Sequence, residues 1–102
     1  MNYEELEKRV IYWAELKGIL GNRDVKAQAM KFGEESGELF GALLRNDKEK
    51  IIDSFGDVLV TLIILAEMTD MDLMFCLAVA YDEIKDRKGK MQDGAFIKEG
   101  EC

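Results

Sequence analysis

Three glutamates stand close together in the stretch "KFGEESGELFGALL", which otherwise has the apolar spacing of a helix. Glu34, Glu35 and Glu38 fall on one broad helical face, because side chains three and four residues apart are neighbours on a helix. Like charges at this spacing repel one another. Taken alone, the stretch is typical of a solvated acidic face, so its interpretation depends on what the rest of the chain places opposite it.

Two aspartates in the next apolar run supply a reason for the cluster. Asp53 and Asp57 lie one turn apart within "IIDSFGDVLVTLIILA", where an unpaired buried carboxylate would be costly. No basic residue follows Lys50 on that predicted helix, so a cation from a neighbouring helix, a bound metal or a protonated state must compensate. The short connection "RNDKEK" makes the two helices antiparallel neighbours, which can bring all five carboxylates together. Such oxygen donors predict a site for Mg²⁺, with Mn²⁺ as an alternative.

The chain contains no His, which narrows the possible chemistry. The commonest general base and the Ser-His and Cys-His nucleophile systems are absent, so any reaction must depend on carboxylates, Lys, Tyr or a metal. A carboxylate-bridged di-iron or di-manganese bundle is disfavoured as well, because such sites characteristically use Glu-x-x-His pairs. The pattern therefore favours acid-rich, magnesium-type chemistry.

Basic and aromatic residues provide candidates for substrate binding. The stretch "EIKDRKGK" places Lys85, Arg87 and Lys88 where the last predicted helix leaves the core. This cluster is either a charge-assisted grip for phosphates or an ordinary solvated helix end favoured by the helix dipole. Lys31, beside the acidic stretch, is a further candidate. Trp13 is interpreted first as a core residue and alternatively as a platform for stacking a base.

The elements that must position these residues are helices within one domain. The chain has 102 residues, 48% hydrophobic and without Pro, enough to bury one core over residues 1–102. Apolar spacing predicts an all-α, four-helix bundle with helices over about residues 3–20, 23–45, 48–68 and 71–87, and with core helices together covering about residues 3–88. The tail, residues 89–102, is expected to form a hairpin around Asp93-Gly94 or an ordered cover.

Burial within these helices is predicted from the same spacing. The third helix is apolar on nearly every face and is therefore expected at the centre. The second helix is expected to bury the following apolar side chains: Ala27, Met30, Leu39, Leu43 and Leu44. A chain this short with so apolar a helix would gain core by pairing with another copy, so we expect a homodimer or homotetramer.

Composition excludes several classes of partner. The net charge of −7, from 14 basic and 21 acidic residues, disfavours nonspecific binding to nucleic acid. Cys76 and Cys102 lack the spacing of a disulfide framework or a zinc site, which fits a reducing, cytoplasmic setting. The N-terminal "MNYEELEKRV" is charged, and no apolar run reaches membrane-spanning length without a charged residue, so neither an export signal nor a membrane anchor is predicted.

The stretch "EESGE", followed by "DSFGD" on the next predicted helix, resembles the MazG-like all-α NTP pyrophosphohydrolases over most of the chain. That family carries Glu-Glu-x-x-Glu on one helix and Glu-x-x-Asp on the next, which together hold Mg²⁺. The first pattern maps onto Glu34, Glu35 and Glu38. In the second, Asp57 aligns with the family's Asp, whereas Ser54 stands at the position of the family's Glu and Asp53 is its nearest substitute.

This resemblance implies hydrolysis of a ribo- or deoxyribonucleoside triphosphate between its α and β phosphates, which releases the monophosphate and pyrophosphate. It also implies an oligomeric bundle in which the carboxylates hold Mg²⁺. Glu35 and Glu38 would be catalytic, with Glu35 accepting a proton from water, while the basic residues of "DEIKDRKGKM" would meet the phosphates. Two alternatives stay open: a noncatalytic helical interaction module that has lost activity, suggested by Ser54, and a phosphoribosyl-nucleotide pyrophosphohydrolase.

Overall fold

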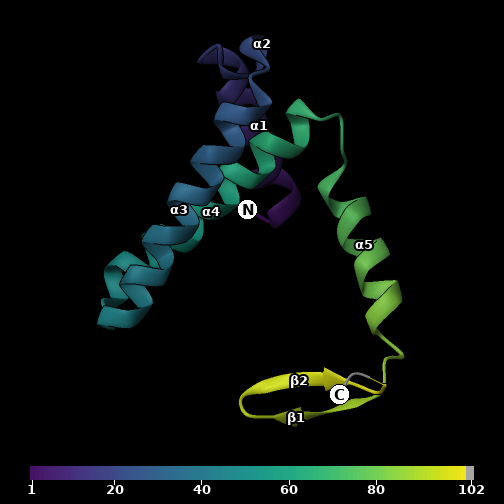
Figure 1. The fold of residues 1–102 in the computed structure, drawn as a ribbon. Coiled ribbons are helices and arrows are strands. Elements are labelled where there is room, and N and C mark those ends of the chain that lie inside the picture. Colours follow the sequence, from purple (N-terminus) through teal and green to yellow (C-terminus); the bar gives the residue numbers. More distant parts are fainter. Residues whose placement is uncertain (101–102) are drawn as a thin grey trace. The chain divides into compact units, whose positions relative to one another are not determined.

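The computed structural model describes residues 1–100 and shows helices followed by one small hairpin (Figure 1). The elements are α1 (Tyr3–Leu16), α2 (Ile19–Asn22), α3 (Val25–Arg45), α4 (Lys48–Met68), α5 (Leu73–Ile84), β1 (Gly89–Gln92) and β2 (Ala95–Lys98). The predicted helical fold is thus confirmed. Cys102, part of the predicted tail, lies outside the described residues. The chain divides into two compact units, Met1–Asp72 and the part that begins at Leu73.

Helix α4 forms the centre of the first unit, as its apolar sequence predicts. It packs along α3 and also contacts α1 and α2. The core consists of Ala14 from α1 with Ile64 and Met68 from α4, and Val10 and Val60 pack against it. A helix that is apolar on nearly every face needs neighbours on several sides, which explains why α4 has three helical partners.

A tight reversal makes α3 and α4 antiparallel neighbours. Asn46 ends α3 in the left-handed conformation with φ 55°, which Asn tolerates better than most residues. Asp47 then caps α4, because its Oδ1 accepts a hydrogen bond of 3.3 Å from the Lys50 N–H. Farther along the pair, buried Gln28 donates from Nε2 to the Thr61 carbonyl at 3.2 Å. These contacts fix which turns of the two helices face each other.

The structure corrects two of the predicted helices. The first breaks at Gly18, where a left-handed φ of 80° separates α1 from the single turn of α2. The last helix is shorter than residues 71–87, since α5 ends at Ile84.

The predicted burial on α3 is mostly wrong. Met30 is 70% exposed and Leu44 is 86% exposed; Ala27 and Leu43 are exposed as well, while Leu39 is half-buried. The reason is that α3 packs mainly on α4, so only one stripe of α3 is covered. Trp13 is 48% exposed, so its interpretation as a core residue is also wrong.

The second unit contains the predicted hairpin. Strands β1 and β2 pair antiparallel, with Gly89 opposite Lys98 and Gln92 opposite Ala95. Asp93 and Gly94 both have positive φ, 51° and 81°, which is typical of the type I′ turn that matches the twist of paired strands. No helix within residues 1–100 has both the length and the apolar character required to cross a bilayer.

Candidate active site

The predicted acidic residues lie on the two longest helices. Glu34, Glu35 and Glu38 project from α3, and Asp53 and Asp57 from α4. Because the helices are antiparallel, the charge of Asp57 acts on Glu35 from across the helix pair, together with the charge of Glu38 from its own helix. Glu38 and Asp57 are thus each close enough to act on Glu35, while convergence of all five predicted carboxylates stays a prediction.

Glu35 is the least solvated of the three α3 glutamates. Its side chain is 13% exposed, and its Oε2 atom is buried with no hydrogen-bond partner among the described residues. Burial raises the pKa of Glu35, and the neighbouring charges of Glu38 and Asp57 raise it further. Lys31 opposes this shift from 3.7 Å, but its side chain is 57% exposed and solvent weakens its effect. Such an oxygen attracts either a cation or a proton.

The chemistry of this donor set fits Mg²⁺. The donors are carboxylate oxygens, which hard cations prefer, and one of them is buried without a protein partner. Within residues 1–100, no group of three or more acidic or cysteine side chains is placed so that it could hold a metal ion. Holding an ion would thus require the flexible glutamate side chains to rotate toward it.

The polar residues on the α4 side of the site differ in how deeply they are buried. Ser54 is 3% exposed, and its neighbour Asp53 points to solvent. Asp57, one turn farther along, is half-buried. Asp57 is therefore the α4 carboxylate that acts on Glu35, while Asp53 is exposed.

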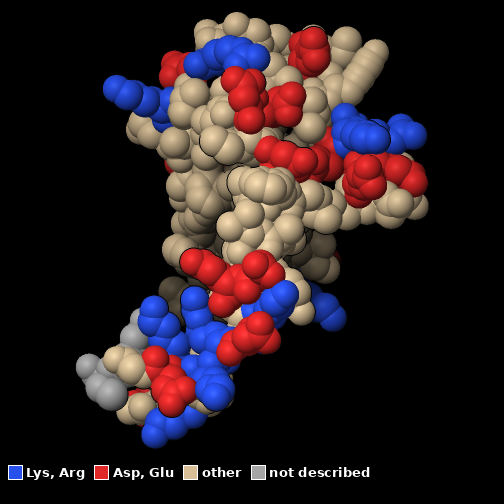
Figure 2. Space-filling view, turned by 90° about the vertical axis from the view of Figure 1, so that its right-hand side faces the viewer, with Lys and Arg blue, Asp and Glu red and all other residues tan. Residues whose placement is uncertain are grey.

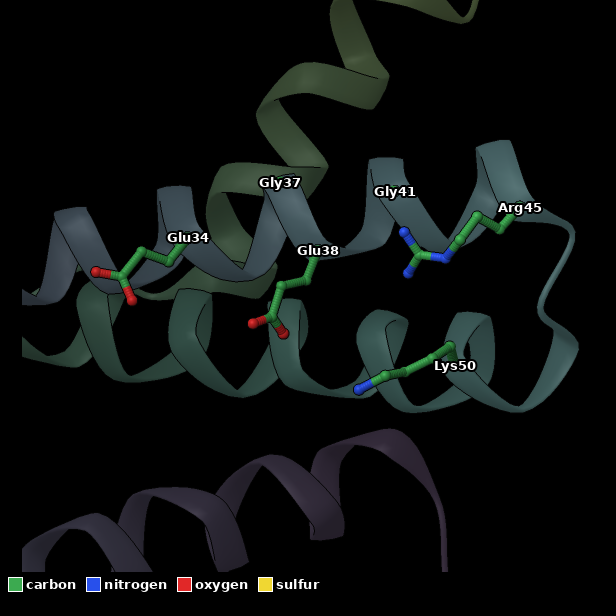
Figure 3. A pocket seen from close by; sticks show the side chains of 6 residues that line it. All are labelled: Glu34, Gly37, Glu38, Gly41, Arg45 and Lys50. Atoms are coloured by element: carbon green, nitrogen blue, oxygen red, sulfur yellow. The ribbon is translucent and has the colours of Figure 1, made fainter.

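A pocket of about 540 Å³ lies beside these acids, within the usual size range of small-molecule sites. Its lining residues are Glu34, Gly37, Glu38, Gly41, Arg45 and Lys50 (Figure 3). Figure 3 shows the two carboxylates toward one end and the two basic side chains toward the other. The α3 wall is open at Gly37, where a Cβ would meet nothing within 4 Å, whereas the space over Gly41 holds the Arg45 guanidinium.

Sequence reasoning missed Arg45 and Lys50. A signal was present for Arg45, because positions 34, 38, 41 and 45 follow one stripe of a helix at spacings of three and four. For Lys50, the signal was its place in the first turn after the reversal that pairs the helices.

The predicted phosphate ligands of the tail lie in the second unit. Lys85 contacts Asp82 at 2.8 Å, while Arg87 and Lys88 stand between α5 and β1. Figure 2 shows basic side chains gathered around the hairpin. Their role toward a phosphate stays a prediction, as does base stacking by exposed Trp13.

Comparison with known proteins identifies the class. Residues 25–92 match the family described as MazG nucleotide pyrophosphohydrolase domain, a range that begins with α3, includes α4 and α5, and ends with β1. It contains both acid-bearing helices and about two thirds of the chain. The chain therefore belongs to the MazG family, which confirms the resemblance found in its motifs.

A relative in the Haemophilus phage HP1 (strain HP1c1) is an uncharacterized 18.2 kDa protein of the rep-hol intergenic region. It is 33% identical over 69 residues, which make up 68% of this chain and 42% of the relative. The chain thus spans less than half the length of that protein. No solved structure matches the chain significantly.

Proposed function

We propose that this chain is a Mg²⁺-dependent nucleoside triphosphate pyrophosphohydrolase, which converts a ribo- or deoxyribonucleotide into its monophosphate and pyrophosphate. One observation carries the proposal: the buried, unpartnered Glu35 oxygen lies in the field of Glu38 and of Asp57 from the facing helix. Membership of the MazG family supports the same class of reaction. The adjacent pocket, acidic at one end and basic at the other, suits a metal-bound polyphosphate.

Each acidic residue has a role in this proposal. Glu34, Glu35, Glu38 and Asp57 would hold Mg²⁺, with Asp53 as an outer contributor. The ion, when bound, supplies neutralisation of phosphate charge and activation of a water. Glu35, buried on α3, accepts the proton of the attacking water. Attack on the α phosphorus breaks its bond to the bridging oxygen, which leaves with pyrophosphate.

The test is pyrophosphate release from a panel of ribo-, deoxyribo- and modified nucleoside triphosphates, and from a phosphoribosyl nucleotide, with Mg²⁺, Mn²⁺ or EDTA. We expect metal-dependent release that prefers particular nucleotides and is lost in Glu38→Gln. A preference for the phosphoribosyl nucleotide would favour that alternative class. If the folded protein releases no pyrophosphate from any of them, the enzyme proposal is wrong. Ser54, buried where the family carries Glu, would then favour a noncatalytic binding module.

We also propose that the chain acts as a homodimer or homotetramer. Large apolar side chains on α3 and α4 are exposed, among them Phe40 at 63%, Leu44 at 86% and Ile52 at 66%. Covering them would contribute about 25 cal/mol for each Å² of apolar surface. Sedimentation equilibrium should give a dimer or larger, and Leu44→Glu should shift it toward the monomer. A monomer at all concentrations would contradict this.

A further inference from the structure

Two basic side chains line one pocket where α3 ends and α4 begins. Arg45 is the last residue of α3, and Lys50 lies in the first turn of α4. The two-residue reversal between the helices brings both to the lining of one pocket. Among the described residues 1–100, neither side chain is engaged in an ion pair. Two cations thus line a pocket without a protein counter-ion, although the chain has a net charge of −7.

The Arg45 guanidinium lies against its own helix, α3. It turns back along its own helix over Gly41, as Figure 3 shows. A Cβ atom at Gly41 would lie 3.1 Å from Nη1 of Arg45 and 3.8 Å from its Cζ. The missing side chain at position 41 therefore makes the room that the guanidinium occupies. From the opposite wall, Lys50 extends along α4 toward Glu38 (Figure 3).

The order of charges along the pocket indicates the ligand. Glu34 and Glu38 lie at one end, and Arg45 and Lys50 lie at the other, where the helix pair itself ends. A ligand that matches this order carries a divalent cation at one end. At its other end it carries phosphate charge that this cation does not neutralise. Guanidinium and ammonium groups are the side chains that make strong, charge-assisted hydrogen bonds to phosphate oxygens.

We propose that Arg45 and Lys50 bind the two terminal phosphates of the substrate, the part that leaves as pyrophosphate. The inference rests on the proposed function, because the reaction must place the α phosphorus near Glu35, away from the basic end. The β and γ phosphates then extend toward the helix reversal, and the nucleoside extends the opposite way. The pair consequently selects triphosphates over diphosphates, which lack the outermost phosphate.

The experiment compares Arg45→Gln, Lys50→Met and the double variant with Lys48→Met. Lys48 is exposed in the same helical turn as Lys50 but does not line the pocket. Lys48→Met therefore removes the same charge as Lys50→Met without changing the pocket. Binding of inorganic pyrophosphate in the presence of Mg²⁺ is measured by calorimetry, and KM and kcat are measured for a nucleoside triphosphate and its diphosphate. Each pocket variant should lose about tenfold or more in pyrophosphate affinity. The preference for triphosphate should shrink by a similar factor, whereas Lys48→Met should behave like the natural protein.

A substitution at Gly41 tests the position of the Arg45 guanidinium separately from its charge. Gly41→Ala keeps both cations but forces the guanidinium to move by a few tenths of an ångström. It should weaken pyrophosphate binding several-fold while stabilising the helix. Gly33→Ala is its control, because a Cβ there meets no heavy atom within 4 Å and gives the same gain in helix propensity. It should keep the pyrophosphate affinity of the natural protein.

The outcomes distinguish this inference from the proposed function. If the double variant binds pyrophosphate as well as Lys48→Met does, the inference is overturned, whether or not nucleotides are hydrolysed. If no nucleotide is hydrolysed but pyrophosphate binding depends on Arg45 and Lys50, the phosphate site stands and the enzyme proposal fails.

Discussion

Replacing Glu35 by Gln should stabilise the metal-free protein. The substitution removes one charge from a group that also holds Glu38 and Asp57, and it gives the buried side chain an amide that can donate to those carboxylates. Removing the penalty for a buried polar oxygen that has no hydrogen-bond partner adds about 1–3 kcal/mol to the free energy of unfolding. The lost contact with largely exposed Lys31 offsets at most about 0.5 kcal/mol. The balance favours Gln by about 1 kcal/mol or more.

The gain should depend on pH with a definite sign. The pKa of Glu35 is raised in the folded protein, so between the ordinary carboxyl value, about 4.3, and the raised value the folded state binds more protons than the unfolded state. Stability therefore falls as pH rises through that window. Glu35→Gln has no such loss, so its advantage should be small at pH 4 and fully developed above the raised pKa.

Thermal unfolding in EDTA, followed by circular dichroism between pH 4 and 8, measures this difference. For a unit of this size, 1 kcal/mol corresponds to about 4–8 °C in Tm. Exposed Glu34→Gln is the control and should change the free energy of unfolding by no more than about 0.5 kcal/mol. Glu35→Gln with an unchanged or lower Tm at pH 8, or with a gain that is equal at pH 4, would refute the account of Glu35 as an unsatisfied buried carboxylate.

Three further predictions test the fold and the α4 side of the site. Gly89→Ala should disrupt the hairpin and remove amide protection from β1 and β2 in hydrogen exchange, because its Cβ would overlap the Phe96 ring and the Ile97 carbonyl; persistent protection would contradict that packing. Gln28→Ala should lower the free energy of unfolding by about 1–3 kcal/mol in urea titrations, since it removes the hydrogen bond to Thr61 and leaves a cavity, and a neutral result would show that this contact does not join α3 to α4. In calorimetric Mg²⁺ titrations, Asp57→Asn should weaken affinity more than Asp53→Asn, because half-buried Asp57 interacts with Glu35 and exposed Asp53 does not; the reverse order would make Asp53 the main α4 ligand.

The sequence was informative wherever a local rule acted alone. Helix spacing placed Glu34, Glu35 and Glu38 on one helix, and the short connection predicted that Asp57 would face them. The Asp93-Gly94 pair predicted the hairpin because both residues must adopt positive φ in its turn. Each of these features depends on a few neighbouring residues and on one backbone preference.

Predictions failed where the answer depends on which surfaces meet. Met30 and Leu44 have the spacing of buried residues, but α3 packs mainly on α4 and leaves them exposed. Arg45 was not predicted as a pocket residue, because its place there depends on how its side chain rotates over Gly41. No pattern of residue types specifies that rotation. Apolar spacing shows which residues can be covered, and only tertiary contacts decide which of them are.

In the metal-free protein, repulsion around Glu35 acts against the contacts that join α3 to α4. Like charges on facing helices oppose the packing of α3 on α4, while the Gln28 hydrogen bond and the Asp47 cap hold the same helices together. A bound divalent cation would reverse the sign of the first contribution and leave the others unchanged. Mg²⁺ should therefore raise the Tm of the natural protein, and at 100 times its dissociation constant the expected gain is about 2.7 kcal/mol. Glu35→Gln, already relieved of repulsion and deprived of a ligand, should gain much less. An equal gain in both proteins would place the ion outside the acidic faces of α3 and α4.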